Sequence, residues 1–326
     1  MQRQIQRLVL FVSGFILASI FWNSCLDLVA DKPVPDAVFS SSIIDLKEKI
    51  LIRNKNTEKI IVVGGSNVAF GIDSIEIKKA FGIETINFGC MAGIGPEVLL
   101  SKIKKHTSNG DIIIFCWEFG LYRFKRSGSN FTYLNLIFGP LTTLRSNYPI
   151  MDKIRLNLKY PTSHIRTSIA VAYNPFADPE IFRCSWNFDE YGNVRSIQEQ
   201  IVKEEELINS PLSALMTELT ITNDVKEILT DFVHSCRNNN IKVLSTWPNT
   251  FNNPKYIKNK VVEKNFLTIK DFWQNLDVPM IGMPEDSMLT AEFFHDTYYH
   301  LNSKGVKIRT KKLIDNLKPQ LIKHAE

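Results

Sequence analysis

The sequence predicts an α/β fold in three layers, in which helices cover both faces of a parallel sheet. Short apolar runs alternate with amphipathic helical stretches on both sides of a long irregular region, and such alternation favours a parallel sheet. The runs are almost continuously apolar, as at residues 111–117, which is typical of strands buried on both faces. Hydrophobic residues make up 44% of the 326 residues, which is enough for a sizeable core.

The first half of the pattern lies between residues 59 and 117. Its strands are short apolar runs rich in β-branched residues, and its helices place apolar side chains three and four positions apart. Val98, Leu99 and Ile103 form one such apolar side. The expected elements, in order, are a strand at 59–63, a helix at 73–81, a strand at 84–88, a helix at 96–106 and a strand at 111–117.

The second half of the pattern follows residue 220. In the final stretch Val306, Leu313 and Leu317 share one face at helical spacing. The expected elements, in order, are a helix at 223–238, a strand at 241–247, a helix at 258–275, a strand at 278–283 and a closing helix at 303–317. Five strands are therefore expected to form one sheet.

Residues 121–220 interrupt the alternation. They carry aromatic residues, prolines and asparagines without a clear period, and the stretch is too long for a simple loop in a compact domain. We interpret it as an insertion that covers or shapes a site; the alternative is a small subdomain without a part in binding. Its aromatic residues either stack on sugar rings or fill a core. They are Tyr122, Tyr133, Tyr148, Tyr160, Tyr173, Trp186 and Tyr191.

The N-terminus differs from the rest of the chain. Residues 8–28 are mostly apolar, and about 20 such residues in a helix are enough to cross a bilayer. Arg3 and Arg7 precede the stretch, whereas Asp31 and Asp36 follow it. The positive-inside rule then predicts a single-pass membrane protein with a cytoplasmic N-terminus and an extracytoplasmic main domain, in the periplasm or at the cell surface.

A cleaved signal peptide is the alternative for this stretch. Leu28-Val29-Ala30 is a poor cleavage site because Leu28 is bulky, and Cys25 lies in a poor lipoprotein context. The predicted organisation is therefore a cytoplasmic stub and transmembrane anchor at 1–30, a tether and lead-in helix at 31–58, and an α/β domain at 59–326 with its insertion at 121–220.

Charge and cysteine content exclude several function classes. The net charge of +5 is mild and the lysines are spread along the chain, so no nucleic-acid surface is predicted. The five cysteines show no paired spacing of the zinc-binding kind. The glycine turn after the first strand lacks the lysine of a phosphate-binding loop. We therefore expect no cofactor and no metal.

Two segments carry groups for nucleophilic chemistry. Gly64-Gly65-Ser66-Asn67 follows the strand at 59–63, so its glycines turn sharply and lift the Ser66 hydroxyl to the edge of the sheet. Asp296 and His300 lie near the C-terminus, just before a helix that Asn302 or Ser303 would cap. A hydroxyl becomes a strong nucleophile when an imidazole takes its proton and a carboxylate orients that imidazole. By itself Ser66 could equally be a helix N-cap, and His300 a surface residue.

Two further strand ends lie at the same edge of the expected sheet. Gly89 follows Asn87-Phe88 and could bring its backbone N–H close to a substrate oxygen, as in an oxyanion hole. Glu118 follows the strand at 111–117. It is a candidate for the rim of a substrate site, where it would bind a sugar hydroxyl, or else a solvated carboxylate at a strand end.

These blocks together resemble the SGNH/GDSL hydrolase superfamily. Within this superfamily, the chain is most similar to the membrane-tethered branch. That branch is of the polysaccharide O-acetylation type, as in alginate acetylation and D-alanyl transfer. The matching blocks are Gly64 to Asp73, Asn87-Phe88-Gly89, and Asp296 to Asn302 followed by Gly305. The resemblance covers about residues 59–120 and 240–320, and it implies a flavodoxin-like, SGNH-hydrolase-like α/β/α sheet.

The resemblance implies a role for each matched residue. Ser66 would be the nucleophile, His300 its general base and Asp296 the group that orients His300, while the Ser66 and Gly89 amides would hold the oxyanion. An acyl-serine intermediate would pass to water or to a sugar hydroxyl of an envelope or exported polysaccharide. Because acetyl donors are cytoplasmic, it also implies an integral membrane acyltransferase as partner.

The sequence departs from the family pattern at two places. The usual D-x-x-H spacing is lengthened by one residue between Asp296 and His300, and the usual oxyanion asparagine is replaced by Glu118 and its neighbours. Asn67 or Asn249 could supply the missing donor. The alternative function is a non-catalytic glycan-binding or scaffold protein on a degenerate hydrolase fold. A third is a secreted lipase-like enzyme with an apolar cleft.

Overall fold

The structure is a computed structural model of the whole chain. It describes residues 2–30, 35–126, 131–138, 141, 143–144, 148–153, 155–156, 186–195, 199, 201–210 and 214–321. The chain divides into two compact units, one formed by residues 1–41 with 130–183 and the other by residues 42–129 with 184–326. The expected insertion at 121–220 is thus shared between the two units. The second unit holds the sheet.

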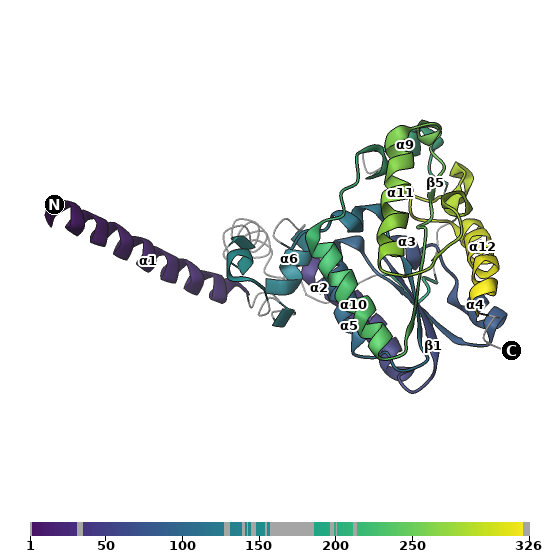
Figure 1. The fold of residues 1–326 in the computed structure, drawn as a ribbon, viewed down its shortest axis with the longest axis horizontal. Coiled ribbons are helices and arrows are strands. Elements are labelled where there is room, and N and C mark those ends of the chain that lie inside the picture. The colour runs from purple at the N-terminus through teal and green to yellow at the C-terminus, as the bar shows by residue number, and fades with distance from the viewer. Residues whose placement is uncertain are drawn as a thin grey trace. The chain divides into compact units, whose positions relative to one another are not determined.

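The central sheet has five parallel strands (Figure 1). Their order is β2-β1-β3-β4-β6, which corresponds to the 2-1-3-4-5 order of flavodoxin-like folds. The strands are β1 (Lys59–Gly64), β2 (Glu84–Gly89), β3 (Ile112–Cys116), β4 (Lys242–Thr246) and β6 (Met280–Ile281). The predicted α/β class and parallel sheet are confirmed. The last strand is much shorter than the expected 278–283, because Gly282 turns the chain with φ of 73°.

Helices cover both faces of this sheet, as predicted. On one face Ile112 and Ile114 of β3 share a core with Ile77 and Leu313, which belong to α4 (Ser74–Phe81) and α12 (Ser303–Leu321). On the other face the Phe115 ring meets Phe232 and Trp273. These two residues belong to α10 (Asn223–Asn238) and α11 (Lys260–Asn275). Helix α5 (Pro96–Lys104) packs beside α10.

The remaining described elements are short, apart from two N-terminal helices. Helices α1 (Gln2–Ala30) and α2 (Pro35–Arg53) precede the sheet, and α3 (Ser66–Ala69) follows β1 directly. The others are η1 (Ala92–Ile94), η2 (Phe119–Arg123), α6 (Phe131–Phe138), α9 (Glu204–Ile208), η4 (Ala214–Met216), β5 (Thr250–Phe251), η5 (Pro254–Tyr256), η6 (Pro284–Ser287), β7 (Met288–Leu289) and η7 (Ala291–Phe293).

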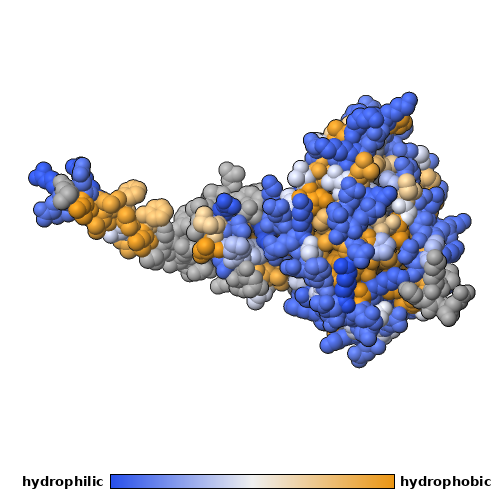
Figure 2. All heavy atoms as spheres, viewed as in Figure 1, coloured by the Kyte–Doolittle hydropathy of each residue, from blue (hydrophilic) through white to orange (hydrophobic). Residues whose placement is uncertain are grey.

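Helix α1 contains the stretch that was expected to cross a membrane. Its apolar side chains are exposed along the helix (Figure 2), with exposed fractions from 45% at Val12 to 73% at Phe11. Even so, no helix among the residues that the structure describes combines the length and the apolar character of a membrane span.

Part of the expected insertion packs on the sheet. Residues 186–195 lie beside the end of β2, where the Asn87 N–H donates to the Tyr191 carbonyl at 2.9 Å. The buried Lys47 ammonium donates to the carbonyls of Asn87 and Gly192. Ser74, the first residue of α4, bonds to Asn193. These contacts bring the segment to the edge of the sheet where β1 and β2 end.

The opposite end of the sheet depends on a buried ion pair. The Lys59 ammonium lies 2.8 Å from Asp111 Oδ2, and both side chains are fully buried. Asp111 also accepts the N–H groups of Lys59 and Ser108. Because a buried ammonium without its carboxylate is strongly destabilising, this pair is essential to the start of β1.

We predict that Asp111→Ala lowers the free energy of unfolding by about 3–5 kcal/mol, because it leaves the Lys59 charge buried and unpaired. The measurement is equilibrium urea unfolding of the full chain, followed by circular dichroism. Glu76→Gln is the matched control, since it removes the carboxylate of the exposed Lys79 pair and should leave the midpoint unchanged. Equal effects of the two substitutions would contradict the prediction.

Candidate active site

Ser66 lies where β1 ends and α3 begins. A Cβ on Gly64 would overlap the Cys116 carbonyl, and a Cβ on Gly65 would overlap the Glu118 carboxylate. Gly64 therefore requires glycine, since the overlapped atom is backbone, whereas a side chain at Gly65 would displace the Glu118 carboxyl group. Ser66 is the first residue of α3, and the Gly65 residue before it provides no side-chain cap. The hydroxyl is thus presented at the carboxyl edge of the sheet.

Glu118 lies against this hydroxyl. The Ser66 Oγ donates to Glu118 Oε1 at 3.2 Å, and the Asn67 N–H donates to the same oxygen at 2.9 Å. In the parallel register Gly64 pairs with Cys116, so the residues two positions further along each chain face one another. Glu118 is only 4% exposed. The structure thus does not place it on an exposed rim or in solvent, as the sequence suggested, because the strand register buries it.

The buried carboxyl group has an altered acidity. Burial raises the pKa of Glu118 above its ordinary value, against the opposing effect of the Asn67 and Ser66 hydrogen bonds and of His300. Burial also raises the pKa of the neighbouring Cys116, Tyr298 and Tyr299. These three groups therefore stay uncharged at neutral pH.

Asp296 and His300 lie in hydrogen-bond contact. The His300 Nδ1 is 2.8 Å from Asp296 Oδ1. The loop between them closes through the Thr297 oxygens, which accept the His300 N–H, and through the His295 N–H, which donates to the His300 carbonyl. This tight turn accommodates the additional residue in the spacing. Burial opposes ionisation of Asp296, but the His295 and His300 contacts outweigh it and hold the pKa of this carboxyl well below its usual range.

Several contacts fix the His300 segment beside Ser66. The His300 ring stacks on Phe70 at 4.5 Å between centroids, and the Leu301 N–H donates to the Phe70 carbonyl. Phe70 follows α3 directly, four residues after Ser66. The Tyr299 hydroxyl accepts the Phe119 N–H, next to Glu118. The imidazole and the hydroxyl therefore lie at the same edge of the sheet.

The Ser66 hydroxyl and the His300 imidazole have separate hydrogen-bond partners. Within the described residues, the Ser66 hydroxyl bonds to Glu118 and not to His300. The His300 Nδ1 is held by Asp296, which leaves Nε2 for a proton from the site. A serine hydroxyl moves between partners by rotating about χ1, so a change of rotamer is one route by which Ser66 could leave Glu118.

The expected oxyanion donors have internal partners. The Gly89 N–H donates to Asn87 Oδ1 at 2.9 Å, and a Cβ on Gly89 would overlap the Ala69 backbone. Gly89 therefore allows close packing of β2 on α3. The side-chain amide of Asn67 donates to the Cys116 carbonyl, and that of Asn249 donates to the Tyr299 carbonyl at 2.6 Å. The amides at the start of α3 face the Glu118 carboxylate.

His295 is a site residue that the sequence analysis did not assign. It is 7% exposed, its Nε2 lies 3.3 Å from Asp296 Oδ1, and its ring stacks on His300. Asp296 thus holds two imidazoles. The sequence shows only that His295 precedes Asp296. That adjacency alone does not place a buried imidazole ring against the Asp296 carboxylate.

His295, Asp296 and His300 could also hold a metal ion, since their ligand atoms lie within 4.8 Å of one another. The geometry favours hydrogen bonding instead. A ligating histidine usually donates its second ring N–H to a partner, whereas the His295 Nδ1 is buried with no partner. If the His295 ring donates to Asp296 through Nε2, its Nδ1 carries no proton. No ring N–H of His295 is then buried without an acceptor.

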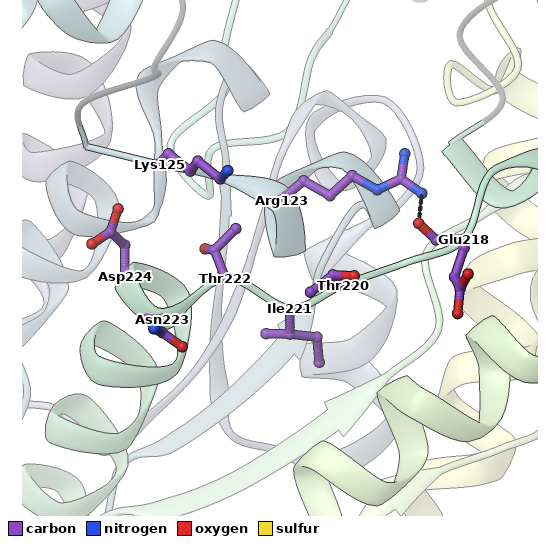
Figure 3. Close-up of a pocket in the computed structure, with 8 residues that line it drawn as sticks. All are labelled: Arg123, Lys125, Glu218, Thr220, Ile221, Thr222, Asn223 and Asp224. Atoms are coloured by element: carbon purple, nitrogen blue, oxygen red, sulfur yellow. Dashed lines mark hydrogen bonds between the residues drawn. The ribbon is translucent and has the colours of Figure 1, made fainter.

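A cleft with several charged residues in its lining begins at the end of η2, on the segment that follows Glu118 (Figure 3). Arg123 forms one end, where its guanidinium donates to the carbonyls of Thr217 and Glu218, and Asp224 lies at the other. The eight residues that line it are Arg123, Lys125, Glu218, Thr220, Ile221, Thr222, Asn223 and Asp224.

No protein-family model matches the chain, and no curated protein matches its sequence. Two solved structures are similar in part. One is the protein YxiM of Bacillus subtilis, with 12% identity and a TM-score of 0.38 over 81% of this chain. The chain spans 57% of the length of that structure. The other is a lipase/acylhydrolase of Enterococcus faecalis, with 12% identity and a TM-score of 0.35 over 81% of this chain and 97% of its own length.

We predict that Gly89→Ala lowers stability, because the new Cβ would overlap the backbone of α3, which cannot move aside as a flexible side chain can. Overpacking of this kind typically costs about 1–3 kcal/mol. Gly120→Ala is the control, since no atom lies near its added Cβ. Thermal unfolding of the two variants tests this prediction, and equal melting temperatures would show that the packing of β2 on α3 is not tight.

Proposed function

We propose that this protein is an extracytoplasmic, serine-dependent acyl-ester enzyme. It transfers an acyl group, most simply acetyl, to an envelope or exported polysaccharide or removes it from one. The supporting observation is that the strand end carrying Ser66 and the loop carrying the Asp296–His300 pair meet at one edge of a parallel sheet, through the contacts of Phe70 with the His300 ring and the Leu301 N–H. Ligands of such sheets bind beyond the carboxyl ends of the strands.

The chemistry follows from the roles that these groups can take. The His300 Nε2 accepts the Ser66 proton while Oγ bonds to the acyl carbon, and Asp296 stabilises the imidazolium that forms. Collapse of the intermediate breaks the bond to the leaving oxygen, which takes the proton from His300. Water or a sugar hydroxyl then attacks the acyl-serine and gives its proton to His300. The bond from the acyl carbon to Oγ breaks, and His300 returns the proton to the Ser66 oxygen.

The substrate class rests on the resemblance to the membrane-tethered polysaccharide O-acetylation branch of the SGNH/GDSL superfamily. In that branch an integral membrane acyltransferase supplies the acyl group, and we propose such a partner here. The exposed apolar side chains of α1 support attachment of the chain to a membrane. Carbonate extraction of cell membranes tests the attachment, since a protein held only by charge would be released.

The position of one aromatic residue of the expected insertion, near His300, supports a contact with a sugar. The Trp186 ring lies edge-on against Phe70, with 4.8 Å between centroids, and Phe70 stacks on His300. Trp186 is partly buried. By contrast Tyr122, Tyr133 and Tyr148 are buried in cores, which corrects their role as candidates for stacking. Tyr160 and Tyr173 lie outside the described residues.

We predict that Trp186→Ala raises KM for the polysaccharide roughly two- to tenfold, the loss expected for one aromatic stacking contact, and leaves KM for a small acetyl ester unchanged. Steady-state kinetics with both substrates measure this difference. Tyr191→Phe is the control from the same segment, because the Tyr191 hydroxyl bonds to Lys78 on α4. An equal effect of Trp186→Ala on both substrates would instead indicate a structural role.

We predict that Ser66→Ala and His300→Ala each reduce turnover of an acetyl ester by roughly 10³-fold or more, because both act in one nucleophilic unit. Mass spectrometry of the wild type mixed with an activated acetyl ester should show one acetyl group on the peptide that contains Ser66. Ser101→Ala is the matched serine control, since that hydroxyl only bonds to the Val98 carbonyl on α5. Equal turnover of the wild type and Ser66→Ala would exclude serine chemistry.

A non-catalytic glycan-binding or scaffold protein is the second candidate. One observation favours it: the Ser66 hydroxyl and the Asn67 N–H are both bonded to a buried carboxylate of the same chain. Under this alternative the wild type and Ser66→Ala bind the polysaccharide equally and neither forms an acyl-enzyme. Binding isotherms together with the labelling experiment separate the two functions.

A further inference from the structure

Glu118 touches the reacting hydroxyl, yet the mechanism above gives it no role. Acyl transfer requires hydrogen-bond donors where negative charge develops on the acyl oxygen. In this site the Gly89 N–H and the side-chain amides of Asn67 and Asn249 are already bonded inside the protein. The Ser66 N–H faces the Glu118 carboxyl group. The protein therefore needs a further donor beside Ser66, and Glu118 is the polar side chain in contact with it.

The two oxygens of Glu118 differ in their surroundings. The hydrogen bonds from the Ser66 hydroxyl and the Asn67 N–H both end on Oε1. Neither of these two hydrogen bonds reaches Oε2, and Oε2 is not one of the enclosed polar atoms that lack a partner. Hence Oε1 is bound to α3, and the small exposed part of this side chain leaves Oε2 reachable from the site.

We propose that Glu118 acts as a neutral carboxylic acid whose Oε2–H donates to the acyl oxygen while Ser66 attacks. The inference rests on the proposed function, since it concerns the same acyl transfer. As the Ser66 Oγ bonds to the acyl carbon, the carbonyl electron pair moves to the acyl oxygen and the serine proton goes to His300 Nε2. Glu118 keeps its proton throughout and only lends it as a hydrogen bond.

The surroundings of Glu118 favour the neutral form. Burial is the largest influence on the carboxyl group and raises its pKa. The titratable groups near it are Cys116 on β3 and the loop residues Tyr298, Tyr299 and His300, with Arg309 of α12 reaching Cys116. The two tyrosines and the thiol stay uncharged. A neutral acid in an apolar site is a known way to provide such a hydrogen bond.

A neutral donor has a defined dependence on pH. Glu118 is protonated below its raised pKa and loses the proton as pH increases through that value, so activity should fall on the alkaline side. In the Glu118→Gln variant the side-chain amide cannot lose its donor proton in this range, while its carbonyl oxygen can still accept the Asn67 N–H. This variant should therefore keep its activity where that of the wild type declines.

The experiment compares Glu118→Gln and Glu118→Ala in the full chain across pH, with an acetyl ester as substrate. We expect Glu118→Ala to lose about 10²–10³ in kcat, the usual effect of removing one oxyanion donor. Glu118→Gln should lose less than tenfold and should lack the alkaline decline. An equal loss of kcat in both variants would mean that the carboxylate itself is required, which would overturn the inference.

A second measurement does not depend on turnover. The infrared difference spectrum of wild type minus Glu118→Gln at neutral pH should contain the C=O band of a protonated carboxylic acid. A carboxylate band in an active enzyme would overturn this inference alone. If the wild type and Ser66→Ala turn over equally, the proposed function fails instead, and the spectrum still reports the state of Glu118. Melting temperatures confirm that each variant is folded.

Discussion

The site depends on the register of β1 and β3. Gly64 pairs with Cys116, and these are the last residues of β1 and β3, so the two chains leave the sheet side by side. That register sets the Ser66 hydroxyl against the Glu118 carboxyl group. The same register explains the glycine at position 65, since a Cβ there would occupy the volume of that carboxyl group. A shift of one residue between the strands would remove each of these contacts.

The imidazole side of the site is held by contacts from three distant parts of the chain. Phe70 supports the His300 ring, Asn249 binds the Tyr299 carbonyl, and the Phe119 N–H binds the Tyr299 hydroxyl. Asp296 is in addition held by the buried His295. A loop held by so many contacts keeps the His300 imidazole in one position, as pre-organised catalysis requires. The mobile part of the pair is then the short Ser66 side chain, which moves by rotation about one bond.

Much of the fold could be predicted because helical and strand periods are local properties of the sequence. All five strands and the helices between them lie near the expected ranges, and Ser66, Asp296 and His300 could be proposed from short motifs. The sequence could not show what depends on contacts between distant segments. The burial of Glu118 comes from strand register, the place of Trp186 from packing beside Phe70, and the orientation of His295 from the turn that closes on Asp296.

A buried carboxyl group beside a nucleophile calls for a physical reason. An ionised carboxylate in this position would lose its hydration in exchange for hydrogen bonds from uncharged donors of α3, and burial of a charge without a strong partner is costly. The Lys59–Asp111 pair shows how the same sheet buries a charge elsewhere, with an ammonium at 2.8 Å. Glu118 has no such cationic partner in a salt bridge among the described residues. Its neutral form removes most of this cost, and it leaves one O–H in a site whose other donors are already bound.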